Sequence, residues 1–151
     1  MKKIIFIHIQ KAGGCTLHSI IEKQYNTNEI FDIDGRLIDN DIDKLIQLPS
    51  EDKSKISCLK GHMYYGLHTH LPDKFYYITM LRDPVERSIS EYYFLKNKSK
   101  GSLGKEVRSK NMSFEDYLRS NISVNVSNLQ TRLISGVKEQ ILKRYPNKMN
   151  K

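Results

Sequence analysis

Short apolar runs alternate along the chain with segments whose apolar residues recur at helical spacing. The runs Ile4–Ile9, Lys55–His62 and Phe75–Leu81 have the length and the β-branched or aromatic character of strands. Strands that are apolar throughout and alternate with helices are typical of a parallel sheet covered on both faces. The pattern therefore predicts an α/β fold, a central parallel sheet flanked by helices in three layers.

Two helices should follow the first and last of these runs. The first carries Leu17, Ile20 and Ile21 on one side and should end near Tyr25. The second starts at Pro84, a residue favoured in the first helical turn. Its apolar face is predicted to consist of Val85, Ile89, Tyr92 and Tyr93.

The remaining segments are less regular. Asn28–Asp52 is acidic, and we expect it to be irregular apart from a short helix near Asp41–Gln47. Lys96–Asn111 is polar, basic and contains glycine, which is typical of a mobile loop. Ser113–Asp116 resembles a capping box, and Asn128–Gly136 should form a helix that stops at its final glycine. The side chains expected to point inward after the capping box are Phe114, Tyr117 and Leu118.

The composition fits a single folded domain. The chain has 151 residues, of which 38% are hydrophobic and 28% charged, so there is enough apolar material for one core. No apolar run approaches the about 18 residues that cross a bilayer, and no secretory cleavage site is evident, so we expect a cytoplasmic protein. Its two cysteines do not make a disulfide framework. The net charge of +8 favours an anionic ligand, but no nucleic-acid-binding signature accompanies it.

A glycine-rich loop, Gln10–Thr16, separates the first predicted strand from its helix. This arrangement aims backbone N–H groups and a helix N-terminus at a phosphate or a similar anion. Gly13 and Gly14 allow positive φ and close backbone approach, and Lys11 adds a positive charge. Thr16 can cap the helix or donate its hydroxyl to a ligand. The alternative is an ordinary turn in which the glycines only redirect the chain.

Three polar features should meet at one edge of the sheet. The Lys11 loop, His62 and Arg82 each follow a predicted strand. Ligands of open parallel sheets bind beyond the carboxyl ends of the strands. We therefore expect these features on one rim.

The loop has the order K-x-G-G-x-T, which differs from the Walker A pattern because its lysine precedes the glycines. It resembles the phosphosulfate-binding loop of sulfotransferases that use 3′-phosphoadenosine 5′-phosphosulfate (PAPS), and HIQKAGGCT is most similar to their carbohydrate branch. The resemblance implies a P-loop-like fold and a loop that holds the 5′-phosphosulfate. The residues implied are Lys11, Ala12, Gly13, Gly14, Cys15 and Thr16.

A second stretch, LRDPVERSIS, places Arg82 at a strand end and Ser90 about two turns into the next helix. An arginine fork suits a phosphate, and this pair resembles the 3′-phosphate-binding motif of the same family. In the alternative interpretation Arg82 pairs with Asp83 and Ser90 faces solvent. The stretch NLQTRLISG also resembles the family, which leaves Gln130 and Arg132 as ligand contacts or as structural residues.

Sulfuryl transfer needs a base for the acceptor hydroxyl, and histidine titrates in the right range. His62 is our candidate, because it follows the second strand and its Gly-His pair resembles the position of the base in glycan sulfotransferases. His68 and His70 are the alternatives, and a structural, hydrogen-bonded His62 is a further one. No third ligand accompanies their H-x-H spacing, so we expect no metal.

The resemblance covers about residues 3–136. It implies a PAPS-dependent sulfotransferase that acts on a carbohydrate hydroxyl and releases adenosine 3′,5′-bisphosphate. Relatives generally continue further, so we expect a member that is short at the C-terminus, ends in a basic tail at 137–151, and binds donor weakly unless a second copy covers the opening. The alternatives are a P-loop-like nucleotide kinase or NTPase, and a non-catalytic module that binds anions or nucleic acid.

Overall fold

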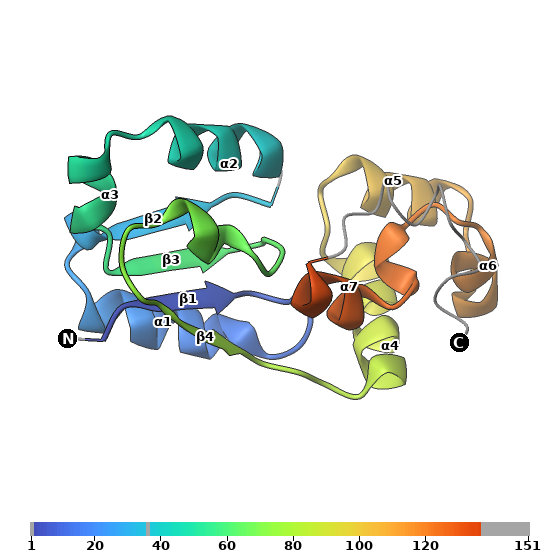
Figure 1. Cartoon of the computed structure of the whole chain (residues 1–151). Coiled ribbons are helices and arrows are strands. Elements are labelled where there is room, and N and C mark those ends of the chain that lie inside the picture. The colour runs from blue at the N-terminus through green and yellow to red at the C-terminus, as the bar shows by residue number, and fades with distance from the viewer. Residues whose placement is uncertain (1, 36, 137–151) are drawn as a thin grey trace.

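The centre of the computed structural model, which describes residues 2–35 and 37–136, is a parallel sheet of four strands. The strands are β1 (Ile4–Ile7), β2 (Ile30–Ile33), β3 (Cys58–Gly61) and β4 (Tyr76–Thr79). They lie in the order β2-β3-β1-β4, so the strand next to the glycine loop is central (Figure 1). The predicted parallel sheet is confirmed.

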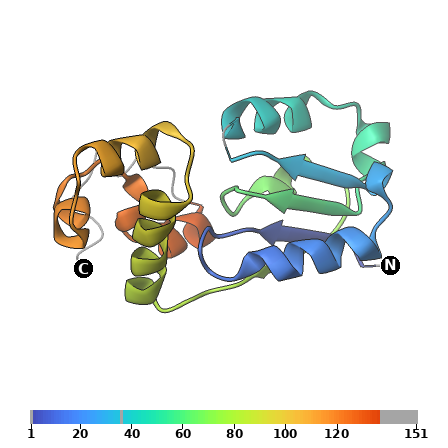
Figure 2. The same ribbon diagram turned by 180° about the vertical axis from the view of Figure 1, so that it is seen from behind.

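Helices cover both faces of this sheet (Figures 1 and 2). On one face Phe6 and Cys58 pack against Ile21 of α1 (Gly14–Gln24). On the other, Ile5 and Leu59 share a core with α2 (Ile38–Gln47) and the short 3-10 helix η2 (Leu67–His70). The helix α3 (Ser50–Lys55) and the 3-10 helix η1 (Thr27–Glu29) connect these elements. The three-layer α/β fold expected from the sequence is therefore observed.

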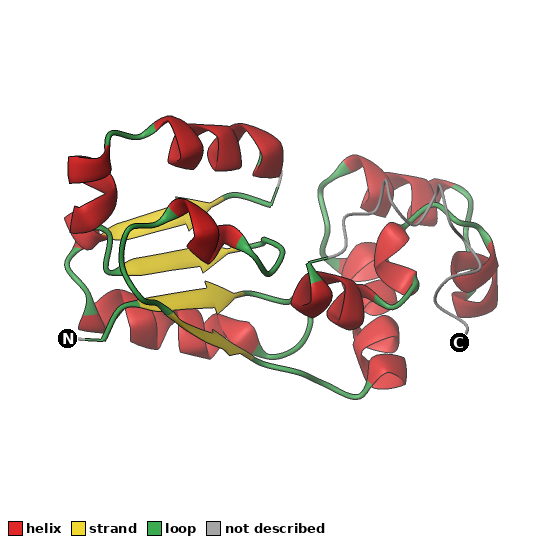
Figure 3. Cartoon of the chain, in the orientation of Figure 1, coloured by secondary structure: helices red, strands yellow, loops and turns green. Residues whose placement is uncertain are grey.

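The second half of the chain is helical and lies beyond the carboxyl ends of the strands (Figure 3). It contains α4 (Pro84–Asn97), α5 (Ser102–Ser109), α6 (Phe114–Arg119), the 3-10 helix η3 (Val124–Val126) and α7 (Leu129–Ser135). Leu129 and Leu133 of α7 belong to the core of the sheet, but α4, α5 and α6 have a core of their own. Its buried members are Tyr92, Leu95, Val107, Met112 and Tyr117. The rim of the sheet where ligands bind in such folds therefore faces this helical layer.

The segment 28–52 is more ordered than its composition indicates. It contains β2, and α2 starts earlier than expected. Strand β2 is hidden in the sequence because it is four residues long and has Asp32 in its middle. That carboxylate is accommodated by Lys60 of the neighbouring β3, with which it forms an ion pair.

The segment 96–111 was predicted as a mobile loop, and this prediction is wrong, because α5 occupies Ser102–Ser109. Leu103 and Val107 are four residues apart and face the core formed with Tyr92 and Leu95. Two apolar positions within a run of lysines are too few to give a helical periodicity in the sequence. Gly104 allows the close approach to Ser99, since a Cβ there would lie 2.7 Å from the Cβ of Ser99.

The predicted apolar face of α4 is also wrong. Tyr92 is buried, but Val85 and Tyr93 are 62% and 57% exposed. The helix instead buries Arg87 and Glu91, with Tyr92 and Leu95 beside them. In α6, Tyr117 is fully buried as expected, whereas Leu118 is 39% exposed.

Several boundaries were predicted well. Helix α1 ends at Gln24, Ser113 and Asp116 form the predicted capping box, and Gly136 is the left-handed C-cap of α7 with φ of 72°. The predicted basic tail at 137–151 lies outside the described residues. No helix within 2–35 and 37–136 is both long and apolar enough to span a bilayer.

Candidate active site

The glycine loop forms a concave turn at the carboxyl end of β1. Lys11 and Gly13 both have left-handed backbones, with φ of 64° and 86°, and Gly13 is the N-cap of α1. No side chain caps this helix, so of the two alternatives for Thr16 the helix cap is wrong, and donation of its hydroxyl to a ligand stays a prediction. The first N–H groups of α1 are thus left for an anion, in the way that helix N-termini bind phosphates.

Gly14 has a different task from Gly13, because it makes room for a histidine ring. A Cβ at this position would lie 2.5 Å from Cδ2 of His8 and 3.3 Å from Cζ of Phe6. Glycine is therefore needed at this position for the packing of His8, and the close approach of the loop backbone to a phosphate stays a prediction.

Lys11 and His62 line the same cavity, which we call the Lys11 cavity and which has a volume of about 380 Å³. The Lys11 ammonium lies 4.5 Å from the centre of the Phe94 ring of α4, a cation–π contact. The cavity is lined by His8, Gln10, Lys11, Cys15, His62, Glu91, Phe94, Leu95, Leu103 and Asn125. The predicted cation and the predicted base are thus brought together, beside an apolar wall from α4 and α5.

The side chain of His62 has a defined tautomer. Its Nδ1 lies 2.7 Å from the carbonyl oxygen of His8, and because a carbonyl oxygen only accepts, this nitrogen must carry the proton. In the neutral ring the other nitrogen, Nε2, then bears the lone pair. The ring is also stacked on His8, with centroids 4.8 Å apart and planes 19° from parallel. The structural alternative, a hydrogen-bonded His62, is therefore observed, and the part of His62 as a base stays a prediction.

His8 stays neutral in this stack. Burial, together with the positive charge that neighbouring His62 can carry, lowers the pKa of His8 from 6.5 to about 4. Its ring lies between Phe6 and His62, and Gly14 approaches its edge. A neutral ring at this position supports His62 without adding a competing charge.

Two further cavities meet at His62. The first, the His18 cavity, has a volume of about 320 Å³ and is lined by His8, His18, Asp32, Ile33, Asp34, Gly35, Gly61 and His62. The second, the α7 cavity, has a volume of about 280 Å³ and is lined by Gln10, Gly35, Ile38, His62, Tyr64, Val124, Asn125, Leu129, Arg132 and Leu133. A ligand could therefore reach the imidazole from more than one direction.

A buried polar network that the sequence patterns did not indicate forms part of the wall of the Lys11 cavity. Arg87 Nη1 donates to Glu91 Oε2 at 2.9 Å, and both side chains are at most 5% exposed. Asn125 Nδ2 donates to Glu91 Oε1 at 2.8 Å and to Gln10 Oε1 at 3.2 Å. The network thus joins α4 to the residue that precedes Lys11. The only sequence signal was an Arg and a Glu four residues apart within a helix otherwise expected to be apolar.

Arg82 and Ser90 lie near this site but are not among the residues that line the Lys11 cavity. Arg82 is exposed and its Nε donates to Glu86 at 3.3 Å, while Asp83 accepts from two backbone N–H groups as the N-cap of α4. The predicted alternative of an Arg82–Asp83 pair is therefore wrong. Ser90 is partly buried. That these two residues bind a 3′-phosphate stays a prediction.

The side chains of Gln130 and Arg132 both contact backbone. Gln130 accepts from the N–H of Arg82 at 2.9 Å and donates to its carbonyl oxygen at 2.7 Å. Arg132 is buried, and its guanidinium donates to the carbonyls of Ser127 and Val124. Both residues thus have a structural part in holding the segments around the site.

The alternative bases are placed less favourably than His62. Nδ1 of His68 lies 3.0 Å from the hydroxyl of Tyr77, whose oxygen also accepts from the N–H of His68. His70 is exposed on η2. Neither residue lines the Lys11 cavity, the His18 cavity or the α7 cavity.

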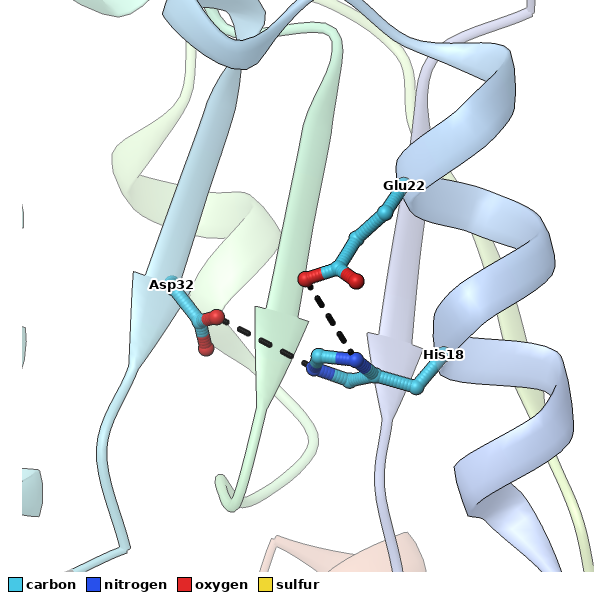
Figure 4. Close-up of side chains that lie close together, drawn as sticks. All are labelled: His18, Glu22 and Asp32. Atoms are coloured by element: carbon cyan, nitrogen blue, oxygen red, sulfur yellow. Dashed lines mark ion pairs between the residues drawn. The ribbon is translucent and has the colours of Figure 1, made fainter.

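One trio of side chains in the described part of the chain has the spacing of a metal site, namely His18 and Glu22 of α1 with Asp32 of β2 (Figure 4). A cation already lies among them. The buried Lys60 ammonium is 2.8 Å from His18 Nε2 and 3.1 Å from Glu22 Oε1, and it also pairs with Asp32. Its hydrogen bond lowers the pKa of the Glu22 carboxyl. This trio therefore works as an ion network that ties α1, β2 and β3 together.

The glycine loop at the end of β1 and His62 at the end of β3 thus lie at the carboxyl rim of a parallel sheet in an α/β protein. The comparison with family models then identifies the family. The model described as the sulfotransferase family matches residues 1–147, and the chain belongs to this family. Searches of curated proteins and of solved structures found no match.

Proposed function

We propose that this protein transfers a sulfuryl group from PAPS to a hydroxyl of a carbohydrate acceptor. Membership of the sulfotransferase family supports sulfuryl transfer. The observation that carries the proposal is the hydrogen bond from His62 Nδ1 to the His8 carbonyl, which leaves Nε2 of the neutral ring to accept a proton, at a residue that lines the same cavity as Lys11. The reaction needs a base to take the proton of the acceptor hydroxyl and a cation to stabilise the leaving phosphate, and both would lie at one cavity.

In the proposed step the acceptor oxygen attacks the sulfur atom of the donor. A new S–O bond forms, the bond from sulfur to the bridging oxygen breaks, and adenosine 3′,5′-bisphosphate leaves with the electron pair. His62 Nε2 takes the hydroxyl proton as the acceptor oxygen attacks. Lys11 and the first N–H groups of α1 offset the negative charge that grows on the bridging oxygen.

The donor would be held along α4. Its 5′-phosphosulfate fits the loop from Lys11 to Thr16, and its 3′-phosphate would be bound by Arg82 and Ser90. The present partner of Arg82, Glu86, is no obstacle, because an ion pair between two exposed side chains contributes little and exchanges readily. Phosphate oxygens offer the arginine fork a stronger, bidentate partner.

The acceptor would approach His62 from the His18 cavity or the α7 cavity. Both contain polar side chains that suit the hydroxyl groups of a sugar, including Asp32 and Tyr64. The carbohydrate branch of the family, indicated by HIQKAGGCT, supports this class of acceptor.

Calorimetry with three nucleotides tests the proposal. Adenosine 3′,5′-bisphosphate should bind at least about tenfold more tightly than 5′-AMP, because a charge-assisted phosphate contact contributes about 1.5–3 kcal/mol. ATP with Mg²⁺ should bind no better than 5′-AMP. Tight binding of ATP–Mg²⁺ would instead favour a kinase or NTPase, and equal affinity for the first two nucleotides would remove the 3′-phosphate site from the proposal.

A further inference from the structure

Both polar groups of the Gln130 side-chain amide form hydrogen bonds with the backbone of one residue, Arg82. Its Oε1 accepts from the N–H of Arg82 at 2.9 Å, and its Nε2 donates to the carbonyl oxygen of Arg82 at 2.7 Å. Each group of the side-chain amide thus meets its complement on one residue 48 positions away in the chain. Two hydrogen bonds at one residue fix its position and its orientation, which a single bond does not.

Arg82 needs such support, because it lies in the connection between β4, which ends at Thr79, and α4, which starts at Pro84. The Asp83 side chain binds the start of α4 through the N–H groups of Val85 and Glu86, and so fixes only one side of the connection. On the other side Met80 and Leu81 are exposed. Without Gln130, the backbone N–H and carbonyl of Arg82 would face water.

The helix that carries Gln130 is itself attached to the other part of the site. The N–H of Tyr65, three residues after His62, donates to the carbonyl oxygen of Leu133 in α7 at 2.7 Å. Gly136 at the end of α7 passes so close that a Cβ there would lie 2.6 Å from the Tyr65 carbonyl oxygen. Helix α7 therefore holds the segment after His62 and, through Gln130, the backbone of Arg82.

From this geometry we infer that Gln130 is a positioning residue for the 3′-phosphate of the donor, acting through the backbone of Arg82 rather than by touching the nucleotide. The inference rests on the proposed function, because it takes Arg82 as the residue that binds the 3′-phosphate. It assigns α7 the task of keeping the arginine at a fixed distance from the His62 end of the site.

The test uses Gln130→Met, which keeps the length of the side chain and removes both hydrogen bonds. Thr131→Val, at the exposed position next to it on the same helix, is the matched control. Calorimetry should show about fivefold to tenfold weaker binding of adenosine 3′,5′-bisphosphate to Q130M, from the loss of two hydrogen bonds that orient Arg82. The affinity for 5′-AMP should change less than twofold, and T131V should match the wild type with both nucleotides.

Two further measurements show whether the effect passes through Arg82. In an Arg82→Ala background, Gln130→Met should have no additional effect on the affinity ratio, because residues that act in one chain of contacts are not additive. Hydrogen exchange at the amide of residue 82 should become faster in Q130M and stay unchanged in T131V. If Q130M does not fold, Gln130→Asn replaces it, since its shorter amide cannot reach both groups of Arg82.

The outcomes separate the inference from the proposed function. If the wild type prefers adenosine 3′,5′-bisphosphate and Q130M keeps that preference, or weakens both nucleotides equally, the inference about Gln130 is wrong and the proposed function stands. If the wild type binds both nucleotides equally, the 3′-phosphate assignment itself fails and the inference fails with it. A selective loss in Q130M that disappears in the Arg82→Ala background supports both.

Discussion

At the scale of single residues, a backbone carbonyl fixes which nitrogen of His62 carries a proton in the neutral ring. The carbonyl of His8 accepts a hydrogen bond from Nδ1, so Nε2 carries the lone pair whenever the ring is neutral, and His62 lines the Lys11 cavity. The Gly61–His62 turn that makes this possible has a left-handed glycine, with φ of 130°, directly at the end of β3. A histidine after a strand was visible in the sequence, but the partner of its Nδ1 was not, because His8 lies 54 residues away.

His62→Ala should lower turnover with PAPS about 10²–10⁴-fold, the usual effect of removing a general base, while the affinity for adenosine 3′,5′-bisphosphate changes little. Initial rates with radiolabelled donor measure the first quantity and calorimetry the second. His68→Ala, whose ring contacts Tyr77 away from the three cavities, is the control. A wild-type rate in the His62 variant together with a large loss in the control would move the base to His68.

The neutral state of His8 makes stability depend on pH. In the unfolded chain this residue takes up a proton below its ordinary pKa of 6.5, whereas in the folded protein the lowered pKa of about 4 delays protonation. The contribution is therefore complete above pH 6.5 and is lost as the pH falls toward 4. Because His8 is only partly buried, we expect a loss on the order of 1 kcal/mol.

Urea unfolding of the wild type and of His8→Asn, each at pH 7.5 and pH 4.5, measures this dependence. The free energy of unfolding should fall more steeply with acid in the wild type than in the variant. Equal falls in the two proteins would show that other groups control the acid sensitivity.

At the scale of elements, α4 differs most from what its sequence suggested. Its buried side carries the Arg87–Glu91 ion pair, while Val85 and Tyr93 of the predicted apolar face are exposed. The physical reason is the polar network that joins Glu91 to Asn125 and Gln10, which are separated from it by 34 and 81 positions in the chain. Helical periodicity reports local burial only, so contacts over such separations cannot be read from it.

The loop and the rim at which it lies were predictable for the opposite reason. Lys11, Gly13 and Gly14 are neighbours in sequence, and their geometry follows from local chemistry and from the strand before them. His62 and Arg82 were placed on the same rim by the general rule for parallel sheets. The sequence did not reveal which of these side chains line the same cavity, because the cavity walls come from α4 and α5, which are distant in the chain.

Glu91→Ala should destabilise the protein by about 3–5 kcal/mol, because it leaves the Arg87 guanidinium buried without its carboxylate. The double variant Arg87→Met/Glu91→Leu should be more stable than this single variant, since no unpaired charge remains. Urea unfolding measures both. The pair Arg119–Glu115 has the same spacing and a similar distance of 3.0 Å but is 78% and 74% exposed, so Glu115→Ala should have almost no effect. A similar loss from both single variants would contradict the assigned role of burial.

At the scale of the whole molecule, the sheet and the helical layer contribute different parts of the candidate site. The sheet places the glycine loop and His62 at its carboxyl rim, and the helices α4, α5 and α7 beyond that rim supply side chains that line the cavities. On the face of the sheet that α1 covers, the buried Lys60 ammonium pairs with Glu22 of α1 and Asp32 of β2 and so holds these two elements together. The site is thus a product of the junction between two layers with separate cores.

Three cavities meet at His62, and this arrangement predicts the order in which substrates bind and products leave. If donor and acceptor occupy different cavities around one imidazole, both can be bound at once, and the sulfuryl group passes directly between them. The enzyme should then follow a sequential mechanism through a ternary complex. Double-reciprocal plots of initial rate at several fixed acceptor concentrations should give intersecting lines. Parallel lines would indicate that a sulfated enzyme forms first and that the acceptor arrives after the nucleotide has left.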